Sequence, residues 1–405
     1  MNGYHFMILC GVAIMAVLLV PIVSAVDPLW TEAGTSSGDL SCIVISGDGS
    51  TIVAGGDRLV ALSRDGRKLW TGWSGTSLAI SRDGNYLVTS RDQTLRLITG
   101  TGTMLWDVSL EVPVTEISML PDASLIAAGG GSRIRIINAS GAGFRQNASI
   151  PFNHFRFLPD GNRLVVTTKE SIQTSNLTLL SEWADTNVTQ DLVEVAGDGS
   201  SFVSVTNNRV RMYTRNGSLQ WDRALPGGNA LAFAYSGDGS TIIVGRDDNT
   251  IEVLDGNGNR LWTGQASYWV TSVAVSDDGN TIAAGSMDKT LSVYDRAGTN
   301  LGSSTLKNPI KSHSVAVSSD GSVITAVDAS AVYGFSRSQF TGQVTPAVTT
   351  TAPPLVVTAP VPAANPVPIL SRPVPTPTTT PQAALNPAAP LAVLGLLLLF
   401  RVRKS

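Results

Sequence analysis

Val273–Gly285 reads VAVSDDGNTIAAG, two short apolar runs joined by an Asp-Gly turn. Short runs of aliphatic and β-branched residues suit half-buried strands, and Asp-Gly suits the tight hairpin between two strands. The same phrase recurs eight times, and its turn aspartate returns at intervals of 35 to 42 residues. These turn aspartates are Asp48, Asp83, Asp122, Asp160, Asp198, Asp238, Asp278 and Asp320.

Each copy continues with a third, alternating run, such as Arg209–Tyr213, and a fourth run that carries a large apolar residue. A period of about 40 residues with four strand-like runs is typical of a β-propeller blade. The sequence therefore predicts an all-β fold over residues 26–340, with eight four-stranded antiparallel blades. A seven-bladed ring is the alternative, should the degenerate fourth copy, Phe155–Trp183, fail to form a complete blade.

The large residue of the fourth run stands 22 to 24 residues after the turn aspartate of its copy, which predicts packing between neighbouring blades. These residues are Trp70, Trp106, Phe144, Trp183, Trp221, Trp262 and Leu301. Trp30 repeats the same phrase ahead of the first full copy. We therefore expect the N-terminal segment to supply the outer strand of the last blade, which closes the ring and removes an open sheet edge. Gln339–Gly342 is the alternative outer strand.

The first three runs of a copy resemble WD40 repeats, as in Ser276–Gly285, and the fourth run resembles the quinoprotein-like repeat, as in Leu254–Trp262. The resemblance covers roughly residues 28–340 and extends to secreted archaeal surface proteins of the methanogen type. It implies a propeller but says little about function, because this architecture carries enzymes, scaffolds and receptors alike. No Gly-His pair opens the copies, and the Trp-Asp pairs at Trp106 and Trp221 fall in the fourth run. The hydrogen-bonded network of WD40 repeats is therefore not expected.

The segments around the ring predict display outside the cell. Residues 1–25 read as a secretory signal cleaved after Ala25, with an uncleaved anchor as the alternative. Residues 341–387 are rich in Pro and Thr, which predicts an extended stalk. Residues 388–405 join a short apolar segment to a basic tail and resemble the C-terminal sorting signals of prokaryotic surface proteins. Direct anchoring in the membrane is the alternative for this last segment.

Composition narrows the class of protein further. The net charge is −3 and only 15% of the residues are charged, with no basic stripe to indicate a nucleic-acid partner. After removal of the signal, Cys42 is the one remaining cysteine, so no disulfide forms within the mature chain. We expect Cys42 to be a buried, unreactive thiol.

Five Asn-x-Ser/Thr sequons fall in the third to fifth copies and predict one glycosylated arc of the ring. The alternative is that Asn, Ser and Thr are simply common in turns. The sequons begin at Asn138, Asn147, Asn176, Asn187 and Asn216.

Catalytic patterns are scarce, and we assign no catalytic, cofactor-binding or metal-binding residue. Asp255–Asn259 resembles the start of a calcium loop, but Ala266 stands where an EF-hand needs glutamate, and a hairpin turn explains the run. The quinoprotein resemblance implies one enzyme alternative, a dehydrogenase that holds pyrroloquinoline quinone over calcium. That alternative would require a paired-cysteine disulfide and gathered carboxylates.

The sequence thus favours a non-catalytic binding or scaffold module for a protein or glycan partner in the cell envelope. Candidate contact residues come from the connections between blades, whose side chains need not serve the sheets. They are Trp73, His154, Tyr268 and Trp269. The alternative for Trp269, and for Phe155 beside His154, is that each begins the next strand and packs between blades.

Overall fold

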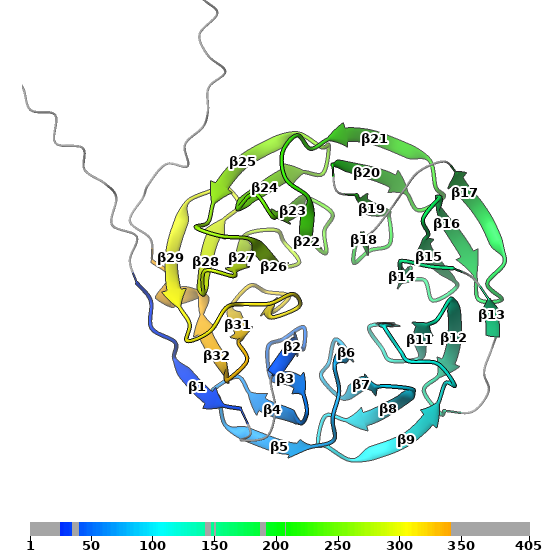
Figure 1. Cartoon of the computed structure of the whole chain (residues 1–405), viewed down its shortest axis with the longest axis horizontal. Helices are drawn as coiled ribbons and strands as arrows, with labels where there is room; N and C mark the ends of the chain where they lie inside the picture. The colour runs from blue at the N-terminus through cyan, green and yellow to red at the C-terminus, as the bar shows by residue number, and fades with distance from the viewer. Residues whose placement is uncertain are drawn as a thin grey trace, which may run out of the picture. The chain divides into compact units, whose positions relative to one another are not determined.

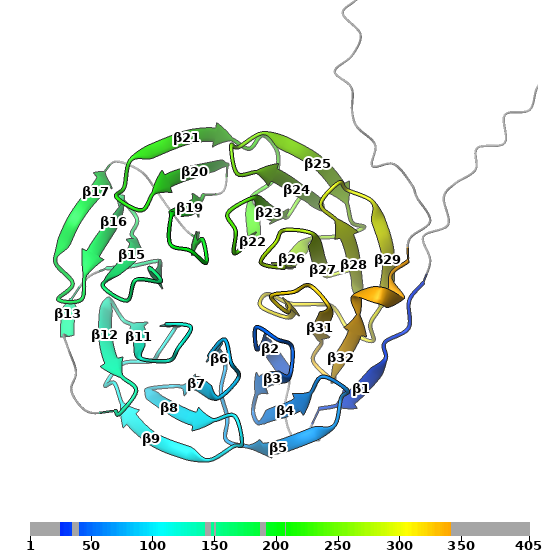
Figure 2. The same cartoon turned by 180° about the vertical axis from the view of Figure 1, so that it is seen from behind.

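The computed structural model describes residues 25–34, 40–141, 147–149, 151–186, 192–206 and 208–341. Within these ranges the strands form eight four-stranded antiparallel sheets, set as blades around a central channel (Figures 1 and 2). The prediction of eight blades is confirmed, and the fourth copy forms a complete blade. Seven blades, the alternative, is wrong.

In each blade the first strand lies innermost and the fourth outermost. Blade 1 contains β2 (Leu40–Ile45), β3 (Thr51–Gly56), β4 (Leu59–Ser63) and β5 (Lys68–Gly72). Blade 2 contains β6 (Ser77–Ile80), β7 (Tyr86–Arg91), β8 (Thr94–Thr99) and β9 (Met104–Ser109). Blade 3 contains β10 (Glu116–Met119), β11 (Leu125–Gly130), β12 (Arg133–Asn138) and β13 (Asn147–Ser149). Blade 4 contains β14 (His154–Phe157), β15 (Arg163–Thr167), β16 (Ser171–Asn176) and β17 (Ser181–Thr186).

The second half of the ring repeats this plan. Blade 5 contains β18 (Leu192–Val195), β19 (Ser201–Val205), β20 (Arg209–Thr214) and β21 (Leu219–Ala224). Blade 6 contains β22 (Ala230–Tyr235), β23 (Thr241–Arg246), β24 (Thr250–Asp255) and β25 (Arg260–Gln265). Blade 7 contains β26 (Val270–Val275), β27 (Thr281–Ser286), β28 (Thr290–Asp295) and β29 (Asn300–Thr305). Blade 8 contains β30 (Val315–Val317), β31 (Val323–Val327), β32 (Ala331–Ser336) and β1 (Trp30–Ala33), and a 3-10 turn η1 (Arg337–Gln339) follows β32.

Antiparallel pairing gives the ring two distinct faces. The turns between first and second strands and those between third and fourth strands share one face, which we call the turn face. The turns between second and third strands and the connections between blades share the other, which we call the loop face.

A Ser-x-Asp-Gly phrase builds the first turn of blades 1, 2, 6, 7 and 8. In blade 1 the Ser46 hydroxyl donates to Asp48 Oδ1 at 2.7 Å, and the Ser50 N–H donates to the same oxygen at 2.9 Å. Gly49 takes the positive φ of 72° that closes the turn. In blade 2 a hydrogen bond from the equivalent serine, Ser81, holds the pKa of Asp83 below its ordinary value. The sequence phrase is therefore a self-contained turn, which explains its recurrence.

A belt of backbone hydrogen bonds links these first turns around the channel. The N–H of one turn donates to the carbonyl of the turn in the next blade. The bonds are Gly47 to Arg82, Arg82 to Pro121, Gly197 to Gly237, Asp238 to Asp277, Asp277 to Ser319 and Ser319 to Gly47, all 2.8–2.9 Å. Pro121 of blade 3 and Pro159 of blade 4 have no N–H to donate. The belt therefore cannot continue from blade 3 to blade 4, or from blade 4 to blade 5.

Tryptophans link the outer parts of neighbouring blades. Trp70 Nε1 donates to Gly100 O of the next blade at 2.8 Å, and the indole lies against Gly102, whose φ is 89°. The same pairing of a ring with a positive-φ glycine recurs around the propeller. The pairs are Trp30 with Gly66, Trp106 with Gly141, Trp183 with Gly217, Trp221 with Gly258 and Trp262 with Gly298.

The equivalent position in blade 7 is a glycine. A β-bulge in the fourth strands shifts the register, so that Val293 pairs with Gly302 just as Val253 pairs with Trp262. Leu301 therefore stands one residue before the position of the tryptophans. It still packs between neighbouring blades, as predicted, in a buried cluster of blades 7 and 8 that includes Val26 and Phe340. Phe144, the expected residue of blade 3, lies outside the described residues.

The N-terminal segment closes the ring, as predicted. β1 pairs antiparallel with β32, with Trp30 opposite Gly334, and Val26 N donates to Ser303 O of blade 7 at 2.8 Å. The alternative outer strand is wrong, because Gln339 belongs to η1 and its Nε2 donates to Asp27 O at 3.0 Å. Both ends of the described fold therefore meet at the rim between blades 7 and 8.

The predicted signal peptide, stalk and C-terminal segment are not tested by the fold. Residues 1–24 and 342–405 lie outside the described residues. Within the described ranges no helix has the length and apolar character needed to cross a membrane.

Replacing Gly102 by alanine should lower the free energy of unfolding by about 2 kcal/mol. The new Cβ would lie 2.7 Å from Trp70 Cγ on a backbone with positive φ, which combines strain with overpacking. Urea denaturation followed by circular dichroism measures the change. Gly72→Ala is the matched control, because nothing lies within 4 Å of its Cβ position. An equal loss in both variants would contradict the proposed tryptophan–glycine contact.

Candidate functional site: the central channel and the loop face

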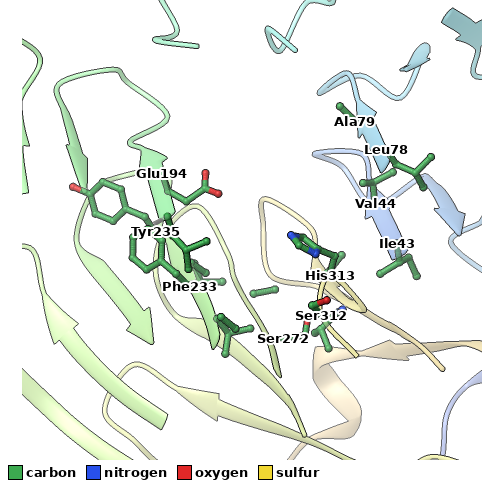
Figure 3. A pocket seen from close by; sticks show the side chains of 18 of the residues that line it. Ile43, Val44, Leu78, Ala79, Glu194, Phe233, Tyr235, Ser272, Ser312 and His313 are labelled. Atoms are coloured by element: carbon green, nitrogen blue, oxygen red, sulfur yellow. Dashed lines mark hydrogen bonds between the residues drawn. The ribbon is translucent and has the colours of Figure 1, made fainter. Parts of the chain in front are cut away.

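The innermost strands enclose a channel with a volume of about 540 Å³. Much of its wall is apolar. Figure 3 shows Val44, Leu78 and Ala79 on one side of the opening, and Phe233 with Glu194 on the other. Every blade contributes residues of its first strand, or of the connection before that strand, to the wall.

A charged arc occupies the wall at blades 3, 4 and 5. Arg156 of β14 stands between Glu116 of β10 and Glu194 of β18. Its Nη2 donates to Glu194 Oε1 at 2.9 Å, its Nε lies 3.2 Å from each oxygen of the same carboxylate, and its Nη1 donates to Glu116 Oε1. The remaining contact of Nη1 is the Phe155 carbonyl at 3.0 Å. One guanidinium thus bridges three consecutive blades.

The three charges stabilise one another. Burial works to raise the pKa of Glu116, but the charge of Arg156 and a contact with His154 outweigh it and hold the pKa at about 2. Burial likewise works to lower the pKa of Arg156, and Glu194 and Glu116 raise it above its ordinary value. Glu116 and Arg156 are therefore both charged at neutral pH.

Two histidines stand beside this arc. His154 Nδ1 lies 3.3 Å from Glu116 Oε1. His313 belongs to the connection between blades 7 and 8, has a φ of 57° and reaches into the channel opening (Figure 3). Loss of water contact inside the channel lowers the pKa of His313, and this exceeds the opposite effect of Glu116. His313 is therefore neutral at pH 7.

The predicted contact residues occupy three separate places. His154 lines the channel, whereas Trp73 lies exposed on the loop face between blades 1 and 2. The Arg96 guanidinium stands 6.0 Å from the centre of the Trp73 ring, so one side of that indole is already covered. Tyr268 and Trp269 lie between blades 6 and 7. Phe155 is fully buried, as the packing alternative expected for it.

Tyr268 and Trp269 form an exposed pair on a fixed backbone. Their rings stack with centroids 5.2 Å apart, and 48% and 43% of the two residues remain exposed. Ser286 Oγ donates to Tyr268 O and Met287 N donates to Trp269 O, both at 3.0 Å. The packing alternative for Trp269 is therefore wrong.

Three sequons have described side chains, and all three lie in third–fourth turns on the turn face of blades 3, 4 and 5. Asn138 Oδ1 accepts from the Ser140 hydroxyl, and Asn176 Oδ1 accepts from Thr178 N, while Asn216 is exposed. Asp255 makes the same turn contact in blade 6, so turn formation alone explains an Asn at the first two positions. Asn147 is described only as backbone, and Asn187 lies outside the described residues. Glycosylation stays a prediction.

Sequence reasoning missed the charged arc. The signal lay in the offsets from the turn aspartates. Arg156 and Glu194 each stand four residues before theirs, and Glu116 and His154 each stand six before theirs. Aligning the first strands on these aspartates would have placed charged residues at equivalent wall positions in consecutive blades.

The fold and the channel identify the class of protein, which is an eight-bladed propeller built from four-stranded repeats. The family model described as "WD domain, G-beta repeat" matches residues 67–99 and 258–295, so repeats of the WD40 type are found at two places in the propeller. Its structure is similar to the C-terminal WD40 domain of Sif2, with a TM-score of 0.66 and 15% identity over 77% of this chain and 99% of that one. It is also similar to Chaetomium thermophilum Sqt1 bound to the N-terminus of the ribosomal protein L10, with a TM-score of 0.64 and 15% identity over 77% and 100%. Identity this low shows the fold alone. No curated protein sequence matches the chain.

Proposed function

We propose that this propeller is a non-catalytic binding module, displayed at the cell surface, that docks a protein partner on its loop face. The observation that carries the proposal is the exposed, stacked pair of Tyr268 and Trp269. Large aromatic side chains on a fixed backbone lose little conformational freedom on binding, so they are the residues that dominate many interfaces.

Two further observations support the proposal. Sqt1, a propeller of similar fold, is described in complex with a segment of another protein. The segments at residues 1–25 and 388–405 support surface display through their sequence. The Pro/Thr-rich residues 341–387 would hold the ring away from the membrane or the cell envelope.

Photo-crosslinking on cells that display the full chain tests the proposal. A photoreactive phenylalanine analogue at Tyr268 should yield one discrete protein adduct, and the same analogue at the exposed rim residue Leu105 should not. Trp269→Ala should weaken that partner's affinity by roughly 30-fold or more, the effect of losing an interface residue worth about 2 kcal/mol. Equal labelling at both positions, or none at Tyr268, would overturn docking at the aromatic pair. A crosslinked adduct that is digested by glycosidases but not by proteases would identify a glycan partner. Protease treatment of intact cells checks surface display.

The quinoprotein alternative needs calcium-binding carboxylates at the ring centre and a disulfide. The two carboxylates of the charged arc, Glu116 and Glu194, are both engaged by Arg156. Among the described residues, no three His, Cys, Asp or Glu side chains are placed to hold a metal ion. Cys42 is a free, buried thiol whose pKa burial raises to about 11. The residues present do not fit that cofactor.

A further inference from the structure

We propose that the central channel receives the basic side chain, lysine or arginine, of the docked protein partner. The inference rests on the proposed function, because it names the chemistry that the partner must carry. It assigns Glu116 and Glu194 as the groups that attract the cation.

The first argument is the balance of charge. Two carboxylates share the single guanidinium of Arg156, and all the described hydrogen bonds of that guanidinium go to them and to the Phe155 carbonyl. Two carboxylates and one guanidinium give the arc a formal excess of one negative charge. The channel wall screens this charge less than bulk water would, so a cation that enters the channel is attracted to the arc.

The second argument is the apolar wall beside that charge. Leu231 keeps 36% of its surface exposed although it lines the channel, and Phe233 follows it two residues later on β22. Lysine and arginine carry a charged end on an aliphatic stem, which covers apolar surface while the charge stays in polar surroundings. Since no metal-holding cluster occurs in the described ranges, an organic cation fits this wall better than a metal ion.

The third argument is position. β26 begins at Val270, directly after Trp269, and its next residues, Thr271 and Ser272, line the channel. β22, with Leu231 and Phe233, belongs to the neighbouring blade 6. A partner segment seated on the aromatic pair therefore lies beside the wall that leads to the charged arc.

The groups around the site also make the binding depend on pH. The charged and titratable groups that line the channel at the arc are Arg156, Glu194, His154 and His313, with Glu116 in contact with Arg156 and His154. Protonation of His313, whose pKa burial lowers below its ordinary value, adds positive charge at the opening and opposes a bound cation. We therefore expect tighter binding at pH 7.5 than at pH 5.5.

Isothermal titration of the full chain with three short peptides tests the proposal. The peptides are acetyl-Leu-Lys-Leu-amide, its arginine analogue and its norleucine analogue, which keeps the stem without the charge. We expect the basic peptides to bind at least about 10-fold more tightly than the norleucine peptide. Glu194→Gln should remove that difference, and Glu170→Gln, an exposed change on the loop face of the same ring, should preserve it.

His313→Lys is the second variant, because it places a fixed positive charge at the opening and leaves the arc intact. It should abolish binding of the basic peptides even if Glu194→Gln fails to fold. Equal binding of basic and norleucine peptides, no binding of any of them at millimolar concentration, or full binding by His313→Lys would each overturn the channel site. Crosslinking at Tyr268 reports separately on docking, so a partner captured there with unchanged affinity in His313→Lys would leave the loop-face function standing and reject only the channel.

Discussion

Replacing Glu252 by glutamine is expected to lower the free energy of unfolding by about 3–5 kcal/mol, because it leaves a buried cation without its partner. Glu252 of β24 and Arg246 of β23 are 1% and 2% exposed, and Arg246 Nη2 donates to Glu252 Oε2. Arg246 also donates to Pro226 O at 2.8 Å, which fixes the guanidinium in place. In the variant the nearest carboxylate left to Arg246 is Asp248, at 3.9 Å. Urea denaturation at pH 7 measures the change.

Asp57→Asn is the matched control for charge removal. Asp57 pairs with Arg91 at 2.9 Å, but both side chains are well exposed, and pairs of this kind contribute less than about 1 kcal/mol. Similar losses in Glu252→Gln and Asp57→Asn would mean that burial of the inner pair does not matter. That result would contradict the expected cost of an unpaired buried charge.

The blades could be predicted from sequence because their determinants are local. Ser46 and Asp48 are two residues apart, and they complete their turn without help from the rest of the chain. The same serine–aspartate bond recurs in blades 2, 6, 7 and 8, and the turn aspartate recurs in every blade, so the pattern can be recognised as a repeat. Ring closure could be predicted for a related reason. The segment around Trp30 repeats the sequence of the other outer strands, yet it lies N-terminal to the first full copy.

Register and channel chemistry were harder to predict. Counting residues from the turn aspartate placed Leu301 in line with the tryptophans, yet Gly302 holds that position, since it pairs with Val293 as Trp262 pairs with Val253. Channel chemistry depends on strands that are distant in sequence. Arg156 has its two partners 40 and 38 residues away, in the blades on either side. The three innermost strands come together only when neighbouring blades pack in the ring. Neither the strand propensity nor the residue spacing within one copy predicts that contact.

Arg156→Met is expected to lower the free energy of unfolding by about 3 kcal/mol and to raise the pKa of Glu116 from about 2 toward its ordinary value. The change leaves Glu116 and Glu194 without their shared cation. It also acts at the interfaces of blade 4 with blades 3 and 5, where the backbone belt lacks hydrogen bonds because Pro121 and Pro159 have no N–H. Arg156 bridges those same two interfaces from inside the channel. Urea denaturation gives the stability, and carboxyl chemical shifts measured against pH give the pKa.

Hydrogen exchange locates the effect. If Arg156 replaces the missing belt bonds, amides of β14 and β18 should exchange faster in the variant, while those of β26, whose blade keeps its belt bonds, should not. The triple variant Arg156→Met, Glu116→Gln, Glu194→Gln removes every charge of the bridge at once and should recover most of the lost stability, since neutral side chains carry no unpaired charge. A single variant as stable as the wild type, with unchanged exchange in β14 and β18, would show that apolar packing alone holds these interfaces. Contacts such as that of Pro159 with Gly199 would then hold blade 4 in the ring. The charged arc would make no contribution to stability.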